Sequence, residues 1–198
     1  MSEQQSADPL RIGVSSCLLG SAVRYDGGHK RDRELLALLG PSVEWIAVCP
    51  EVEAGMGIPR PALQLVRDGE ELRLREVASG RDHTREMQRF AARRLRELRK
   101  AQLDGYVLKK SSPSCGMAGV RLHAMAKRPE ATASGLFAHA LMEAFPALPV
   151  EEEDRLRDPQ RCEHFLERAL AYRRQERASR LVGPTTGSRA STPSTGSS

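Results

Sequence analysis

Hydrophobic residues recur along the chain with two different spacings, which predict strands and helices in alternation. Short apolar runs of strand length occupy residues 11–16, 43–48, 105–109 and 148–150. Apolar residues at every third or fourth position, the spacing of one helix face, occupy residues 31–39, 82–102, 134–145 and 159–181. Strands that alternate with helices are typical of an α/β domain with a mostly parallel sheet flanked by helices. We therefore expect a single domain of this class.

One segment departs from this alternation. Residues 63–67 and 72–77 each alternate apolar and polar positions, and the Asp68-Gly69 pair between them favours a tight turn. This pattern predicts a small β-hairpin inserted into the α/β domain.

The composition changes at both ends of the chain, and this sets the expected domain boundaries. Residues 1–10 are polar and are expected to form a flexible leader. Residues 183–198 are rich in Gly, Ser, Thr and Pro, a composition typical of a disordered tail. Between them we expect the α/β domain over residues 11–151 and a C-terminal helical extension over residues 152–182.

The overall composition narrows the class of protein further. The chain has 198 residues, of which 39% are hydrophobic, in addition to 16 glycines, and this is ordinary for one globular domain. No run approaches the roughly 20 apolar residues that a membrane-spanning helix needs, and the polar N-terminus lacks the apolar segment of a signal peptide. We therefore expect a cytoplasmic protein with no membrane contact. The net charge of +5 is spread over the chain and does not by itself indicate nucleic-acid binding.

Three of the four cysteines stand at or shortly after the end of a predicted strand. They are Cys17, Cys49 and Cys115. Because parallel strands end at the same edge of a sheet, we expect these thiols to cluster there. No Cys-x-x-Cys pair is present, and disulfides are rare in the cytoplasm. The cysteines therefore favour a soft metal centre with one free coordination position, and both a zinc ion and an iron–sulfur cluster accept such ligands.

The sequence gives less support to a role of the fourth cysteine at the metal centre or to a catalytic cysteine–histidine pair. Cys162 shares one face of the last predicted helix with Phe165 and Leu166, so it is expected in the core. None of the five histidines follows a predicted strand, so the sequence does not favour a cysteine nucleophile paired with histidine.

Three sequence motifs carry a family resemblance. They follow one another within about residues 11–151, and they read SSCLLG with VRYDGG, then VCPEV, then KSSPSCG. They resemble the thiouracil desulfidase (TudS-type) family, long known as a domain of unknown function. The resemblance implies that Cys17, Cys49 and Cys115 hold a 4Fe–4S cluster whose free iron takes the sulfur of a thiolated uracil. It also implies that Glu51 assists water attack, that Ser112 helps to handle protons and water, and that sulfide is released.

Other residues in and near these motifs are candidates for binding a thiolated uracil base or nucleotide. They are Arg24, Tyr25, Asp26, Gly27, Arg60, Lys109 and Ser114. An aromatic ring and several cations suit a uracil ring with an attached phosphate. Turn formation explains the Asp26-Gly27 pair, Ser112 and Ser114 equally well, and capping of backbone amides is an alternative role for Glu51, so these interpretations stay open.

The C-terminal part resembles family members that carry a further helical domain, which is absent from this sequence, and that remove sulfur from 4-thiouridine in tRNA. Arginines along the last predicted helix leave tRNA as a further candidate partner. Two other functions are compatible with the sequence. One is a non-catalytic module in which zinc or an iron–sulfur group only stabilises the fold, and the other is an RNA-binding accessory protein.

Overall fold

The computed structural model describes residues 8–124 and 129–182. Residues 1–7 of the expected leader, and the whole expected tail at residues 183–198, lie outside the described residues. Leu10, the last residue of the expected leader, is buried and begins the first strand.

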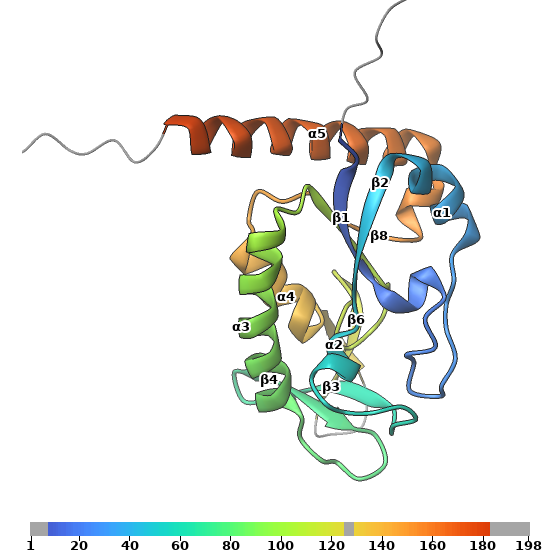
Figure 1. Ribbon diagram of the computed structural model, residues 1–198. Coiled ribbons are helices and arrows are strands. Elements are labelled where there is room, and N and C mark those ends of the chain that lie inside the picture. Colours follow the sequence, from blue (N-terminus) through green and yellow to red (C-terminus); the bar gives the residue numbers. More distant parts are fainter. Residues whose placement is uncertain (1–7, 125–128, 183–198) are drawn as a thin grey trace, which may run out of the picture.

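The centre of the fold is a four-stranded parallel sheet with the strand order β2-β1-β5-β8, of which Figure 1 labels β1, β2 and β8. Its strands are β1 (Leu10–Ser15), β2 (Val43–Val48), β5 (Gly105–Leu108) and β8 (Val150–Glu152). The predicted α/β class with a mostly parallel sheet is therefore confirmed. Because all four strands run the same way, the segments that follow them leave from one edge of the sheet.

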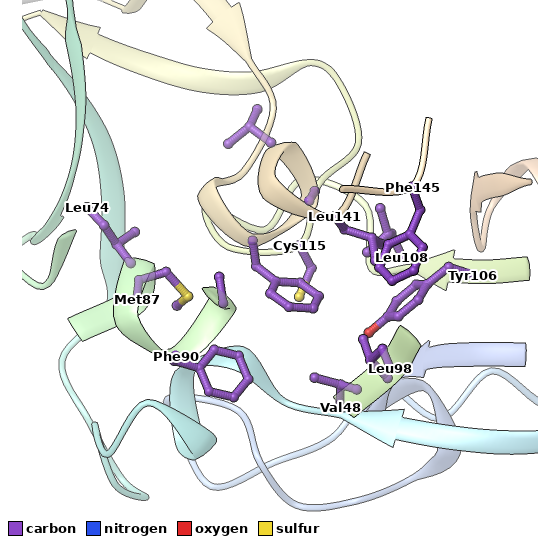
Figure 2. Close-up of a cluster of buried hydrophobic side chains, with 14 of the residues drawn as sticks. Val48, Leu74, Met87, Phe90, Leu98, Tyr106, Leu108, Cys115, Leu141 and Phe145 are labelled. Carbon is purple, nitrogen blue, oxygen red and sulfur yellow. The ribbon is translucent and has the colours of Figure 1, made fainter. Parts of the chain in front are cut away.

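Helices cover both faces of this sheet, as its apolar strands require. The longer helices are α1 (Arg33–Leu39), α3 (Thr84–Ala101), α4 (Leu136–Ala144) and α5 (Pro159–Val182). Ile12 and Val14 of β1 pack in one buried cluster with α1 and α5, and Cys162 belongs to this cluster, as predicted. Tyr106 and Leu108 of β5 pack in a second cluster with α3 and α4, shown in part in Figure 2.

The predicted hairpin belongs to a second sheet that the sequence pattern did not reveal. This sheet has the order β4-β3-β6-β7 and consists of β3 (Leu63–Asp68), β4 (Glu71–Glu76), β6 (Val120–Ala124) and β7 (Pro129–Ala133). β3 and β4 form the expected antiparallel hairpin, and β3 also pairs in parallel with β6. Among residues 120–123 of β6, whose burial the structure describes, Val120 and Leu122 are buried, and this alternation is too short to predict a strand.

Two short helical turns follow the first two strands directly. They are η1 (Ser16–Leu19) after β1 and α2 (Pro50–Glu53) after β2. Cys17 lies within η1, and Cys49 is the N-cap of α2. Because the chain turns as soon as each strand ends, both cysteines stay at the edge of the sheet.

The long helix α5 lies across the opposite end of the sheet, where β1 begins (Figure 1). Its Arg173 donates to the Asp104 carboxylate at 2.7 Å and to the carbonyls of Asp8 and Pro9 at 2.7 Å each. Two short turns, η2 (Gly40–Ser42) and η3 (Arg155–Arg157), complete the described elements. Within the described ranges, no helix is both long and apolar enough to cross a membrane.

Candidate metal centre

Three thiols line one cavity at the carboxyl edge of the parallel sheet. Cys17 comes from η1, Cys49 from the end of β2, and Cys115 from the loop after β5. The cavity between them has a volume of about 200 Å³. The structure thus brings together the three cysteines that the sequence predicts at strand ends.

Burial disfavours the charged form of these thiols. Burial, and to a smaller extent the neighbouring Cys49 thiol, raise the pKa of Cys17 from 9.0 to about 11. Burial also raises the pKa of Cys49 and of Cys115 above the ordinary value of 9.0. The nearby Lys109 and Arg24 charges act in the opposite direction on Cys17 but do not offset its burial. A metal would supply the positive charge that buried thiolates need.

The donor set at this cavity consists of three sulfur atoms, from Cys17, Cys49 and Cys115. Among residues 8–124 and 129–182, no three His, Cys, Asp or Glu side chains form a group that could hold one metal ion. Cysteine thiolates are ligands of both zinc and iron–sulfur clusters, so the chemistry of this donor set fits either group.

Glu51 lies in α2, two residues after Cys49, and lines the same cavity. Its Oε1 accepts a hydrogen bond from the Ser114 hydroxyl at 2.9 Å. Its Oε2 accepts from Arg60 Nε at 2.8 Å and also from Arg60 Nη2. Donors from two separate loops therefore hold the Glu51 carboxylate in one orientation at the cavity wall.

Two of the predicted substrate-binding residues, Arg60 and Ser114, donate hydrogen bonds to Glu51, and Arg60 also lines the cavity. The Arg60 side chain is only 4% exposed and also donates to the Gly57 carbonyl at 3.1 Å. Ser114 is completely buried and does not line the cavity. Sequence reasoning could not show that both residues hold Glu51, because these contacts depend on which loops meet in the fold.

Ser112 shapes the turn that presents Cys115. Its hydroxyl oxygen accepts from the backbone N–H groups of Ser114 at 3.2 Å and Cys115 at 3.1 Å. Ser112 also lines the cavity. It can therefore both hold the turn and face a molecule in the cavity.

Two buried carboxylates on the edge of the sheet hold the Cys115 loop from the other side. Glu152 Oε1, at the end of β8, accepts from the backbone N–H of Met117 at 2.9 Å. Glu153 accepts from the backbone N–H of Lys110 at 2.7 Å and pairs with the Lys109 ammonium group. Sequence reasoning missed both residues, although the acidic run directly after the last predicted strand is a visible signal.

The VRYDGG motif divides between the cavity wall and a turn. Arg24 and Tyr25 line the cavity, with the guanidinium carbon 5.4 Å from the ring centre. Asp26 and Gly27 do not line it. Asp26 Oδ1 accepts from the Gly28 N–H at 3.0 Å, and Gly27 has a φ of 74°, so these residues form the tight turn.

The fold and the site define an α/β protein with three cysteines and a carboxylate around one cavity at the carboxyl edge of a parallel sheet. The sequence profile of the 2-thiouracil desulfurase family matches residues 12–153, and the chain belongs to this family. The resemblance read from the three motifs is therefore confirmed.

The chain is also similar to two known proteins. The chain is 30% identical over 138 residues to the uncharacterized protein YbbK of Bacillus subtilis, an alignment that covers 67% of this chain and 90% of YbbK. It is also similar to the solved structure of TudS, a [4Fe-4S]-dependent thiouracil desulfidase, with a TM-score of 0.59 and 33% identity. That match covers 74% of this chain and 93% of the TudS chain.

Proposed function

We propose that this protein is a thiouracil desulfidase, which replaces the sulfur of a thiolated uracil by oxygen from water. Membership of the 2-thiouracil desulfurase family and 33% identity to TudS support this activity. The observation that carries the proposal is the single cavity lined by Cys17, Cys49, Cys115 and Glu51.

In this proposal Cys17, Cys49 and Cys115 hold a 4Fe–4S cluster. When bound through three cysteines, such a cluster supplies a thiophilic, Lewis-acidic iron with a free position for the sulfur of the substrate. The protein contributes a buried pocket of sulfur donors, which restricts the access of water to the site.

The reaction converts a thiocarbonyl and water into a carbonyl and hydrogen sulfide, without net electron transfer. The attacking water must give up protons, so a base within hydrogen-bond reach is needed. Glu51 Oε1 accepts one hydrogen bond, from Ser114, and has a second lone pair with which to accept a proton from water. Arg60 and Ser114 are positioning residues that hold this carboxylate toward the cavity.

Tyr25 is the aromatic side chain on the wall of the cavity, and it is 43% exposed. A flat ring of this kind provides a stacking surface for a pyrimidine. Ser112 offers a hydroxyl group on the same wall. These two residues are therefore proposed to orient the uracil ring.

The decisive experiment compares two cysteine substitutions after anaerobic purification and reconstitution. We expect about four irons per chain in the unchanged protein, and loss of both iron and desulfidase activity in Cys115→Ala. Cys162→Ala is the matched control, because Cys162 is also buried but packs in the α1–α5 cluster away from the cavity. Its iron content is expected to stay unchanged. Colourless protein with stoichiometric zinc, or equal iron in both variants, would contradict the proposal.

A further inference from the structure

The helix α2, which follows Cys49 and carries Glu51, is too short to be stable by itself. It has one turn, Pro50–Glu53, and a single helical turn gains too few hydrogen bonds to offset the entropy lost in forming it. Its position must therefore depend on contacts with the rest of the fold. The longer helix α3 lies beside it and supplies such contacts (Figure 1).

Glu53, the last residue of α2, is linked to Cys49 by two hydrogen bonds. The backbone N–H of Glu53 donates to the Cys49 carbonyl at 2.9 Å, which is an ordinary helical bond. The Glu53 side chain turns back, and its Oε1 accepts from the backbone N–H of Cys49 at 2.8 Å. This second bond satisfies a backbone group at the helix start in the way that a capping box does. Glu53 therefore holds both backbone polar groups of one candidate cluster ligand.

Arg94 of α3 holds the other oxygen of the Glu53 carboxylate. Arg94 Nε lies 3.3 Å from Glu53 Oε2, and the two side chains are 22% and 34% exposed. Arg94 Nη2 also donates to the carbonyl of Ala47, in β2, at 3.4 Å. One guanidinium group thus contacts the chain on both sides of Cys49, before it at Ala47 and after it at Glu53.

Arg94 has a second carboxylate partner, which lies on its own helix. Glu97 Oε2 accepts from Arg94 Nη1 at 2.8 Å, and the Glu97 side chain is 50% exposed. In the described part of the chain, Glu97 forms no hydrogen bond or ion pair with α2. The two carboxylates share one guanidinium group, but only Glu53 connects that group to Cys49.

We propose that Glu53, held by Arg94, is a positioning residue for Cys49. This inference rests on the proposed role of Cys49 as a cluster ligand and adds the residues that keep this ligand in place. Glu53 does not line the thiol-lined cavity, so it acts through Cys49 and not on a substrate. Removing a group that orients a metal ligand typically costs about 10–100-fold in metal affinity or activity.

The rate at which a chelator removes iron from the reconstituted protein tests this role. In Glu53→Ala the Cys49 N–H loses its acceptor, and we expect iron release to become about tenfold faster. Glu97→Ala is the matched control, because it also removes a carboxylate from Arg94 but leaves Cys49 untouched. Its rate of iron release is expected to equal that of the unchanged protein.

Two further measurements separate positioning from general stability. Glu53→Gln loses the charge that pairs with Arg94 but keeps an oxygen that can accept from the Cys49 N–H. Its rate of iron release should therefore lie closer to that of the unchanged protein than to that of Glu53→Ala. The electron paramagnetic resonance spectrum of the reduced cluster reports the surroundings of its ligands, and it should change in Glu53→Ala but not in Glu97→Ala.

Equal iron release in Glu53→Ala and Glu97→Ala would overturn the inference. So would a loss of iron from Glu53→Gln as fast as from Glu53→Ala, because the ion pair and not the bond to Cys49 would then be responsible. If the unchanged protein binds no iron, the assignment of the ligands fails and both proposals fail with it. If the variants release iron as expected but no thiolated uracil is converted, the desulfidase proposal alone fails.

Discussion

At the scale of single residues, the site depends on how one carboxylate is held. Both oxygens of the Glu51 carboxylate accept hydrogen bonds. Oε1 accepts from Ser114, and Oε2 accepts from Arg60. Because these donors come from different loops, the carboxylate needs no reorganisation when a substrate enters. The structure therefore suits Glu51 to proton transfer at one fixed place in the cavity.

Removing the charge of Glu51 tests this role. Glu51→Gln keeps an oxygen that can accept from one donor but cannot accept a proton, so kcat is expected to fall about 100-fold or more. Iron content should stay unchanged, because the three cysteines are untouched. Desulfidase assays and iron analysis of the folded protein would measure both effects.

Two controls accompany the Glu51 substitution. Glu143→Gln removes an exposed carboxylate from α4, with a side chain 69% exposed, and is expected to leave kcat unchanged. In Glu51→Gln, Arg60 loses its charged partner, and this loss can destabilise the fold. The melting temperature of the variant measures that effect. Normal turnover by Glu51→Gln would show that the base lies elsewhere.

At the scale of elements, the first turn of α4 fixes the loop that carries Cys115. Backbone N–H groups of this turn donate to carbonyls of the loop. The Phe137 N–H donates to the Ser114 carbonyl at 3.0 Å, and the Leu136 N–H donates to the Pro113 carbonyl at 3.1 Å. Gly135 precedes the helix as its N-cap and lies against the same loop. A helix start and a candidate cluster ligand are thus packed against each other through backbone atoms.

This packing predicts a strong effect of one added methyl group. In Gly135→Ala the new Cβ would lie 2.5 Å from the Ser114 carbonyl carbon, so the loop must shift. We expect a melting temperature about 5 °C lower and a reduced iron content, because overpacking against backbone costs about 1–3 kcal/mol and displaces Cys115.

Gly40→Ala is the control for this substitution. Gly40 has a φ of −51°, and a Cβ there would meet nothing within 4 Å. Thermal unfolding and iron analysis of both variants would test the expectation. If Gly135→Ala matched Gly40→Ala in both measurements, the contact between α4 and the loop would have no influence on the site.

At the scale of the whole molecule, the two ends of the parallel sheet serve different purposes. The carboxyl edge carries the cavity, whereas α5 closes the opposite end (Figure 1). Arg173 of α5 and Asp104 before β5 form an ion pair whose side chains are 11% and 8% exposed. This pair joins the C-terminal helix to the start of the sheet, far along the strands from the thiols.

Breaking this pair should affect stability but not the site. Arg173→Gln leaves Asp104 without its guanidinium partner, so the free energy of unfolding is expected to fall by about 3 kcal/mol. Iron content per folded chain should not change. Arg174→Gln is the control, because Arg174 is the exposed neighbour on the same helix. Urea unfolding would measure the difference, and equal stability of both variants would contradict a structural role for the pair.

The amino-acid sequence by itself determined the α/β class, the positions of the main strands along the chain and the three cysteines that meet. Alternating periodicities are local properties, and parallel strands necessarily end at one edge, so Cys17, Cys49 and Cys115 could be predicted together. The position of Glu51 near the cysteines could also be expected, because Glu51 stands two residues after Cys49 in the VCPEV motif.

Only the tertiary structure decided which side chains face one another. Pairing of β3 with β6 joins segments more than fifty residues apart, and Glu51 meets Ser114 at a separation of 63 residues. Such contacts depend on where distant loops lie after the sheet has formed, and no local pattern encodes them. For this reason the hydrogen bonds from Arg60 and Ser114 to Glu51 could not be foreseen from the sequence.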